Sequence, residues 1–330
     1  MNRGCGAVNL VIMRRQILGI HHVTAIADDP QENLDFYIEA LGLRLVKLTV
    51  NFDDPGTYHF YFGGGEGRPG TLLTFFPWPG APQGRRGTGQ ATRVAFSIPE
   101  RALNFWTERM QARGITVEGP ERRFGEDALV MRDRHGLELA LVATADAREP
   151  WPGGPVAAEH AIRGLHGVTL AEEGLERTAA LLETLGFRLL EERGSRLRFA
   201  AGSGGPGAFV DVEVAPDLRP GRVAVGSVHH VAWRTAGDAE QREWHRRIAA
   251  LGYNVTPIID RRYFRSIYFR EPGGVLFEIA TDGPGFTVDE PAARLGSALM
   301  LPPALEPRRK ELEMHLPAVT IPGAAGFGIS

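Results

Sequence analysis

The hydrophobic and polar positions along the chain repeat one arrangement four times. Each repeat contains a junction between a helix-like and a strand-like pattern with a central glycine, at Gly42, Gly114, Gly186 and Gly252, which are 72, 72 and 66 residues apart. An alternating apolar segment begins about twenty residues before each glycine, and further β-like runs follow it. Glycine is the residue that best fits the left-handed position after a helix end. The pattern therefore predicts four βαβββ units.

The first and fourth units show the expected elements most clearly. In unit one, the pattern predicts a helix over 31–41 and strands over 19–27, 59–62 and 71–76. In unit four, it predicts a helix over 239–251 and strands over 228–235, 266–269 and 275–280. An open curved sheet of this size cannot bury both of its faces alone, so we expect an α+β fold in which the units pair.

A stretch rich in proline and glycine, residues 149–155, lies between the second and third units and indicates a linker. The predicted organisation is an N-terminal domain over 18–148 and a C-terminal domain over 156–283, each of two units. A tail over 284–330 follows, with a helix of solvated charges expected over 306–316. The length of 330 residues fits two domains of about 150 residues each.

Composition excludes several classes of function. Hydrophobic residues make up 43% and charged residues 23% of the chain, as in globular proteins, and a net charge of −3 gives no reason to expect nucleic acid or an anionic membrane as a partner. The apolar segment 8–13 is too short for a signal-peptide core or a membrane span, so a cytoplasmic location is expected, and Met13 is a second candidate start. The single cysteine, Cys5, excludes a disulfide framework, an iron–sulfur cluster and a cysteine-based zinc site. Any metal must therefore bind to His, Asp or Glu.

Comparing the first strands of the four units identifies one position, here called the histidine position, where two units carry histidine. It holds His22 in unit one and His230 in unit four, but Arg93 in unit two and Gly167 in unit three. Both histidines follow another histidine in a His-His-Val sequence. Units two and three therefore cannot supply a metal-binding imidazole at this position.

The last strands, aligned on their leading glycines, define a second position, here called the carboxylate position. Unit four carries Glu278 there, while the other units carry Thr74, Ala140 and Asp211. A carboxylate in an apolar strand costs several kcal/mol unless it is paired, so Glu278 should be paired or bound to a metal. His22, His230 and Glu278 thus form a single predicted site of two histidines and one carboxylate. Such a site leaves open positions for substrate and dioxygen on Fe(II), although zinc accepts the same ligands.

Neighbouring side chains of a strand point to opposite faces, so we expect only one histidine of each pair to line the cavity. The equivalence of positions favours His22 and His230 over His21 and His229. Thr24, two residues after the first ligand, is expected on the same face as that ligand.

Four segments, 19–24, 263–270, 272–278 and 285–287, resemble the vicinal oxygen chelate superfamily and, within it, the hydroquinone-type ring-cleaving dioxygenases. The resemblance extends over about residues 18 to 282. It implies paired βαβββ modules that form cupped mixed sheets around a divalent metal. It also implies that the metal ligands come from the first and fourth modules, which are the two units that the comparison of positions identified independently.

The resemblance further implies Fe(II) as the cofactor, with a small hydroquinone- or catechol-like aromatic and O2 as substrates, and cleavage of a carbon–carbon bond beside a ring hydroxyl. It places Tyr268, as proton donor, and Thr24 near the bound substrate. An arginine near Asp260 is also expected there; Arg261 and Arg262 are not separated by the sequence, and Arg262 is taken as the candidate.

Two other functions stay open. A glyoxalase-type lyase or isomerase usually has a fourth protein ligand, but the corresponding position here holds Thr74. A metal-free protein that binds a small aromatic or an antibiotic would not need the three predicted ligands. A homo-oligomer is compatible with the sequence. His59 either faces the cavity or packs within its strand, and His166 is expected to be a hydrogen-bonded core residue. The aromatic residues that could either wall a pocket or pack in the core are Phe75, Phe76, Trp78 and Trp233.

Overall fold

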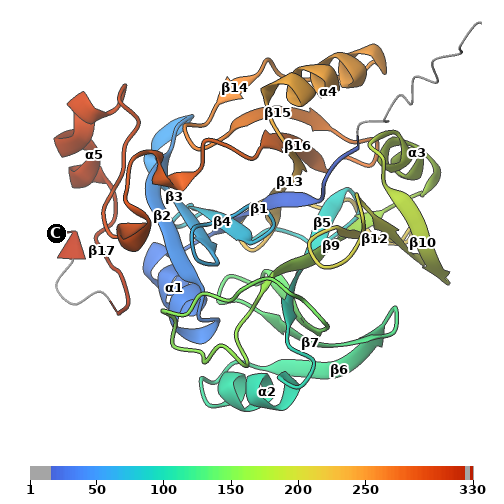
Figure 1. Cartoon of the computed structure of the whole chain (residues 1–330), viewed down its shortest axis with the longest axis horizontal. Helices are drawn as coiled ribbons and strands as arrows, with labels where there is room; N and C mark the ends of the chain where they lie inside the picture. Colours follow the sequence, from blue (N-terminus) through green and yellow to red (C-terminus); the bar gives the residue numbers. More distant parts are fainter. Residues whose placement is uncertain (1–15, 324–327, 330) are drawn as a thin grey trace, which may run out of the picture.

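The computed structural model describes residues 16–323 and 328–329. Cys5 and Met13 lie outside these residues. Two large curved sheets stand one above the other in Figure 1, with helices at their outer sides. None of the helices in the described part of the chain is both long enough and apolar enough to cross a membrane.

The four predicted units, called modules from here on, are all present, and the first sheet is built from modules one and four. Its eight strands in spatial order are β14 (Ile259–Asp260), β15 (Arg265–Arg270), β16 (Leu276–Thr281), β13 (Val228–Thr235), β1 (Ile20–Ala27), β4 (Leu72–Pro77), β3 (Asp54–Gly63) and β2 (Arg44–Asn51). The first strands of the two modules, β1 and β13, pair antiparallel at its centre, while each pairs parallel with the last strand of its own module.

The second sheet repeats this arrangement with modules two and three. Its strands in order are β10 (Arg188–Arg193), β11 (Arg196–Ala200), β12 (Phe209–Val214), β9 (Gly164–Glu172), β5 (Gln90–Ile98), β8 (Glu138–Ala143), β7 (Glu126–Arg132) and β6 (Val117–Arg123). The predicted α+β fold of paired βαβββ modules is therefore confirmed. The division into domains 18–148 and 156–283 stays a prediction, and both sheets contain strands from each side of it.

One helix follows the first strand of every module. These helices are α1 (Pro30–Asp35), which continues as a π-helical turn over Phe36–Ala40, α2 (Leu103–Gln111), α3 (Glu176–Thr184) and α4 (Asp238–Ala250). The four repeated glycines after them have positive φ angles, between 66° and 93°, as the sequence pattern required. Large side chains such as Trp106 on α2 and Trp244 on α4 are fully buried in a core that contacts both sheets.

The tail runs beside β2, the edge strand of the first sheet. Met300 donates its N–H to Leu48 O at 2.9 Å and accepts a hydrogen bond from Thr49 Oγ1. Lys47, fully buried on the same strand, forms an ion pair with Asp289 at 2.7 Å and a second with Glu290. The tail thereby covers hydrogen-bonding groups of an edge that would otherwise be open to another chain.

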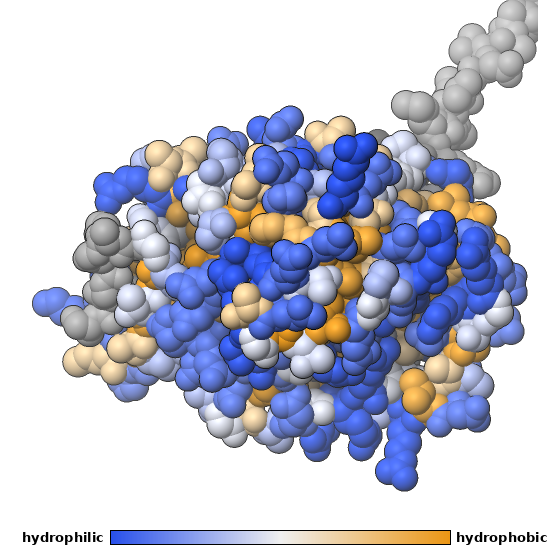
Figure 2. Space-filling view, turned by 90° about the horizontal axis from the view of Figure 1, so that it is seen from below, coloured by the Kyte–Doolittle hydropathy of each residue, from blue (hydrophilic) through white to orange (hydrophobic). Residues whose placement is uncertain are grey.

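The rest of the tail contains short elements: the 3₁₀ helices Phe286–Val288, Ala292–Arg294 and Glu306–Arg308, the helix α5 (Arg309–His315), and the paired strands β17 (Val319–Thr320) and β18 (Gly328–Ile329). The helix expected over 306–316 is present as two consecutive parts, and its charges form exposed ion pairs. Figure 2, a view of the molecule from below, shows a face on which hydrophilic residues predominate, with hydrophobic residues between them.

Candidate metal centre

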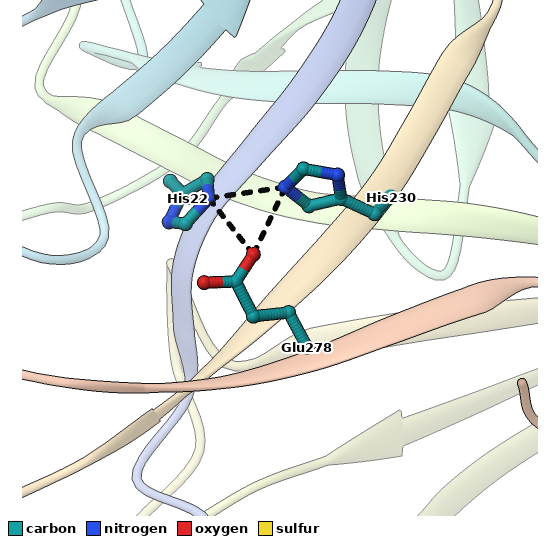
Figure 3. Close-up of side chains that lie close together, drawn as sticks. All are labelled: His22, His230 and Glu278. Atoms are coloured by element: carbon teal, nitrogen blue, oxygen red, sulfur yellow. Dashed lines mark hydrogen bonds and ion pairs between the residues drawn. The ribbon is translucent and has the colours of Figure 1, made fainter. Parts of the chain in front are cut away.

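Three side chains from the centre of the first sheet converge on one point (Figure 3). His22 on β1 and His230 on β13 direct their Nε2 atoms at each other at 3.3 Å. Oε2 of Glu278, on β16, lies 3.4 Å from the first nitrogen and 3.0 Å from the second. All three side chains are buried, with at most 4% of each residue exposed. The structure thus brings together the three residues that the comparison of modules selected.

The strand pairing explains how the two histidine pairs are arranged. Between β1 and β13, Ile20 pairs with Trp233 and His22 with Ala232, so His21 is an extra residue in β1. Across the same pair, β13 contains one extra residue, His229. Both are β-bulges, which re-aim side chains and often occur beside functional sites. The first histidine of each pair is therefore a bulge residue that directly precedes the ligand histidine.

The bulges change one expectation. Strict alternation predicted that only one histidine of each pair would line the cavity, whereas His229 and His230 both line it. The same bulge position in the second sheet holds Thr92, before Arg93, and His166, before Gly167. The register thus repeats in all four modules.

The bulge histidine His21 fixes the tautomer of the ligand histidine His22. His21 Nε2 lies 3.1 Å from Thr281 O, and since a carbonyl only accepts, this nitrogen must carry the proton. Burial, with the nearby His22, lowers the pKa of His21 to about 3, so its Nδ1 bears a free lone pair. Nδ1 of His22, 2.9 Å away, must then be the donor, which leaves its Nε2 lone pair facing the carboxylate. In module four, His229 Nδ1 likewise lies within hydrogen-bond distance of His230 Nδ1, at 2.8 Å.

The state of Glu278 fits a bound cation. Its Oε1 accepts a hydrogen bond from Ser266 Oγ, but its fully buried Oε2 has no hydrogen-bond partner. Burial would raise the pKa of this carboxyl, yet His22 and His230 together lower it well below its usual value. An ionised carboxylate oxygen within 3.4 Å of two imidazole nitrogens is a donor set for a divalent transition metal.

A cavity with a volume of about 330 Å³ opens above the three side chains. Much of its wall is aromatic, and it also includes the turn between β2 and β3. The lining residues are His22, Asn51, Phe52, Asp53, His59, Tyr61, Phe76, Trp78, His229, His230, Arg261, Phe264, Tyr268 and Leu276. Of the aromatic residues considered from sequence, Phe76 and Trp78 line this cavity, whereas Phe75 and Trp233 pack in the core.

Tyr268 and an arginine form one polar wall of the cavity. The hydroxyl of Tyr268 accepts a hydrogen bond from Arg261 Nε at 3.1 Å, and the same guanidinium forms an ion pair with Asp53 at 2.8 Å. Burial and the charge of Glu278 raise the pKa of Tyr268, so its hydroxyl keeps its proton at neutral pH.

The structure places the two candidate arginines differently. Arg261 lines the cavity, whereas Arg262 lies against Asp289 of the tail, with 3.4 Å between Nε and Oδ2. The backbone at Arg262 has a positive φ of 70°, and the side chain of this residue contacts the tail rather than the cavity.

Thr24 lies beneath the cavity rather than in its lining. Its Oγ1 is 2.8 Å from Thr74 Oγ1, which also lies 2.9 Å from Nε2 of His59. His59 itself lines the cavity, which resolves the two possibilities left by the sequence. Burial, together with the ligand histidines, lowers the pKa of His59 well below its usual value. The threonines therefore hold a neutral imidazole at the cavity wall.

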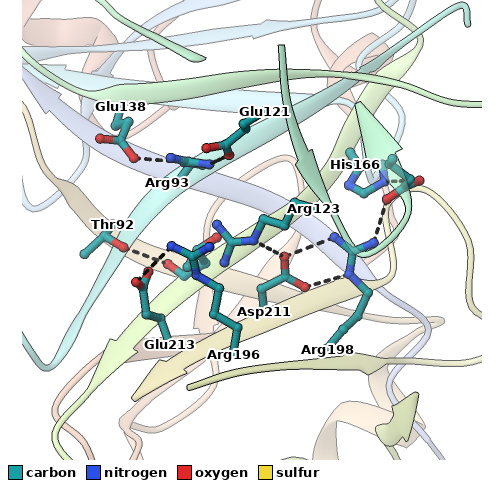
Figure 4. Close-up of polar contacts among 12 residues, drawn as sticks. Thr92, Arg93, Glu121, Arg123, Glu138, His166, Arg196, Arg198, Asp211 and Glu213 are labelled. Carbon is teal, nitrogen blue, oxygen red and sulfur yellow. Dashed lines mark hydrogen bonds and ion pairs between the residues drawn. The ribbon is translucent and has the colours of Figure 1, made fainter. Parts of the chain in front are cut away.

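The equivalent place in the second sheet is filled by ion pairs (Figure 4). Arg93, at the histidine position, donates to Glu138 at 2.8 Å and also pairs with Glu121. Asp211, at the carboxylate position, accepts two hydrogen bonds from Arg198, at 2.7 and 3.0 Å. Side chains of opposite charge thus occupy the space that the metal ligands surround in the first sheet.

His166 completes this network. Its Nε2 lies 3.0 Å from Oε1 of Glu126, whose other oxygen accepts from Arg198 at 2.6 Å. The residue is 1% exposed, which agrees with the expected role as a hydrogen-bonded core histidine. Burial alone would raise the pKa of Glu126, but the contacts with His166 and Arg198 lower this pKa to about 2.

Comparison with known proteins supplies independent evidence on the family. The model of the "Glyoxalase/Bleomycin resistance protein/Dioxygenase superfamily" matches residues 19–141 and 164–279. These two segments contain all three converging side chains and the four module helices, so the match covers the fold and the candidate site together.

Similar proteins cover nearly the whole chain. "Putative ring-cleaving dioxygenase MhqO" of Bacillus subtilis is 46% identical over 306 residues, 92% of this chain and 97% of the relative. "Chlorohydroquinone/hydroquinone 1,2-dioxygenase" of Sphingobium indicum is 36% identical over 308 residues, 90% and 95% of the two chains. The crystal structure of a putative dioxygenase from Bacillus subtilis superposes with a TM-score of 0.90 at 45% identity, covering 93% of this chain and 99% of the other.

Proposed function

Because the chain belongs to the glyoxalase, bleomycin resistance protein and dioxygenase superfamily, we propose that it is an Fe(II)-dependent ring-cleaving dioxygenase that acts on a hydroquinone- or catechol-like aromatic with O2. The names of the two relatives support the reaction class, since both are ring-cleaving or hydroquinone dioxygenases by name.

The convergence of two histidine Nε2 atoms and the buried Glu278 Oε2 beside an aromatic-walled cavity is the observation that carries the proposal. Three protein ligands on one side of an ion leave positions on the cavity side for exogenous ligands. A cavity of about 330 Å³ has room for a single substituted benzene ring rather than a polycyclic or peptide substrate.

His22, His230 and Glu278 would hold the metal. Fe(II), when bound there, would lower the pKa of a ring hydroxyl and bring it beside dioxygen. The protein contributes by fixing the imidazole orientations through His21 and His229, since such outer partners orient the ligands and make them more basic. The aromatic wall keeps the site dry and packs against the faces of the ring.

Tyr268 and Arg261 are proposed to act on the substrate. The tyrosine keeps its proton and receives a hydrogen bond from Arg261 Nε, so its own O–H is free to donate to a substrate oxygen in the cavity. The guanidinium places a permanent positive charge beside any anion that forms on the ring. In this role the arginine next to Asp260 is Arg261.

The glyoxalase-type alternative is not favoured by the geometry. Its fourth ligand would come from the position of Thr74, but that hydroxyl lies 2.8 Å from Thr24 Oγ1 and 2.9 Å from His59 Nε2. A hydroxyl with both neighbours in hydrogen-bond contact is a structural group rather than a fourth ligand. A binding protein would have no need for the buried, unpartnered carboxylate oxygen of Glu278.

The test is anaerobic reconstitution with Fe(II), followed by measurement of O2 uptake with hydroquinone, chlorinated hydroquinones and catechols. We expect uptake of one O2 per ring opened with at least one of these substrates, and none in a Zn(II)-loaded control. The proposal fails if no substrate supports uptake while the protein binds Zn(II) tightly, because that combination is expected of a lyase or isomerase.

A further inference from the structure

A second acidic site lies away from the cavity, where the second sheet meets the turn between β15 and β16. A surface cleft of about 490 Å³ is lined there by Thr88, Glu172, Glu173, Gly174, Glu176, Arg177, Thr178, Pro220, Pro272 and Gly273. Among these described residues three are glutamates and one is basic, so the cleft attracts cations.

Glu172, the last residue of β9, is the unusual member of the lining. It is 0% exposed, and neither of its carboxylate oxygens has a hydrogen-bond partner. Burial and the neighbouring charge of Glu271 raise the pKa of Glu172 to about 8. A buried carboxylate with two unused oxygens is unfavourable unless a ligand completes its surroundings.

A second carboxylate and a hydroxyl lie beside it. Glu271, 2% exposed, accepts hydrogen bonds from Val275 N at 2.9 Å and from Thr178 Oγ1 at 2.8 Å. A carboxylate has about four acceptor positions, so each oxygen of Glu271 keeps the capacity to contact a cation. Thr178 uses its proton in this bond, which leaves the lone pairs of its oxygen available.

Gly273 makes room for this arrangement. A Cβ at this position would lie 1.6 Å from Oε2 of Glu172, so every other residue type would displace the carboxylate. The φ of Gly273 is not positive, so its backbone does not require glycine. Gly273 is therefore required because the carboxylate of Glu172 fills the position where a side chain would lie, and not because of the backbone conformation. The carboxylate in that position has no hydrogen-bond partner.

We propose that this cleft binds a hard divalent cation, Mg²⁺ or Ca²⁺, between Glu172 and Glu271, with Thr178 and water completing the shell. Oxygen ligands from one or two carboxylates plus several waters are typical of Mg²⁺, and Ca²⁺ accepts the same donors at longer distances. The cleft provides no imidazole or thiolate ligand, so it differs in chemistry from the triad of the first sheet.

The cation would join the two sheets. Glu172 ends β9 of the second sheet, whereas Glu271 lies in the turn that leads into β16, which carries Glu278. Binding would also displace a proton from Glu172, since this carboxyl is protonated at neutral pH without a cation. The charged groups that face Glu172 are Glu271, Glu173, Glu176 and Arg177.

The test uses the full-length chain with its triad loaded with Zn(II). It is titrated calorimetrically with MgCl2 and, separately, CaCl2 at pH 7 in two buffers of different ionisation enthalpy. We expect one cation per chain and release of close to one proton. Glu172→Gln should weaken binding about tenfold or more, because even outer partners of a metal contribute 10–100-fold. Glu173→Gln, an exposed carboxylate in the same lining, is the matched control and should change affinity about twofold or less.

The two salts distinguish the ions, and tighter binding of either supports the proposal. Absence of binding by both, or equal affinity in wild type and Glu172→Gln, overturns it. If Glu172→Gln does not fold, the wild-type titration decides: binding without proton release would place the cation elsewhere and contradict the proposal.

Discussion

The bulge histidine His21 offers a sharp test of how the site is organised. Replacing it with alanine removes the acceptor of the His22 Nδ1 proton, 2.9 Å away in a buried environment. A buried donor left without a partner costs about 1–3 kcal/mol. The imidazole can avoid this cost by changing tautomer, but it then presents Nε2–H to the metal. We therefore expect Fe(II) affinity to fall about 10- to 100-fold, the usual effect of losing an outer partner of a ligand histidine.

The assay is competition for Fe(II) or Co(II) against a chromophoric chelator under anaerobic conditions. His21→Asn should recover part of the loss, because its Oδ1 can accept in place of Nδ1. His166→Ala is the matched control: His166 occupies the same bulge position in module three but precedes Gly167, which is no ligand. It should leave metal affinity unchanged. Wild-type affinity in His21→Ala would refute the proposed orientation of His22.

Three further predictions concern catalysis and stability. Tyr268→Phe should lower kcat about 10²–10⁴-fold with metal content unchanged, measured by O2 uptake, because it removes the proton donor; an unchanged kcat would exclude that role. Lys47→Met should destabilise the protein by about 3–5 kcal/mol in urea denaturation and make the tail sensitive to protease, since Asp289 loses its buried partner. Glu126 has a lowered pKa of about 2, so its stabilisation is complete above the unfolded value near 4.5 and is lost as pH falls towards 2. The difference in unfolding free energy between wild type and Glu126→Gln should therefore shrink from pH 6 to pH 2.5; a constant difference would contradict the assigned pKa.

The repeat made much of the fold and the site predictable. Internal comparison predicted the four modules, their left-handed glycines and the equivalence of His22 with His230. It could do so because every module has the same order of elements and buries the same face of its sheet. The pairing of modules one and four followed from the positions of the two histidines and Glu278. Alignment of the last strands on their leading glycines identified the carboxylate position, and in the structure Glu278 lies on β16, paired in parallel with Ala232 of β13.

Other features depend on backbone detail or on contacts between distant segments. The bulges at His21 and His229 add one residue to a strand without a distinctive composition. Alternation therefore holds for His22, which lines the cavity without His21, but fails for His229, which lines it together with His230. The sequence did not separate Arg261 from Arg262, because which of the two lines the cavity depends on the conformation of the loop after β14. The contact of Asp53 with Arg261 joins the turn of one module to a loop more than two hundred residues away, which no local pattern encodes.

The central claim is that His22 and His230, with Glu278, bind one metal ion per chain. The most direct test is metal content by mass spectrometry after anaerobic loading and gel filtration, in His22→Ala, His230→Ala, His21→Ala and His229→Ala. We expect the first two variants to lose bound metal and the last two to retain it under saturating conditions, though more weakly. Full retention in His22→Ala, with loss in His21→Ala, would contradict the assignment of the ligands.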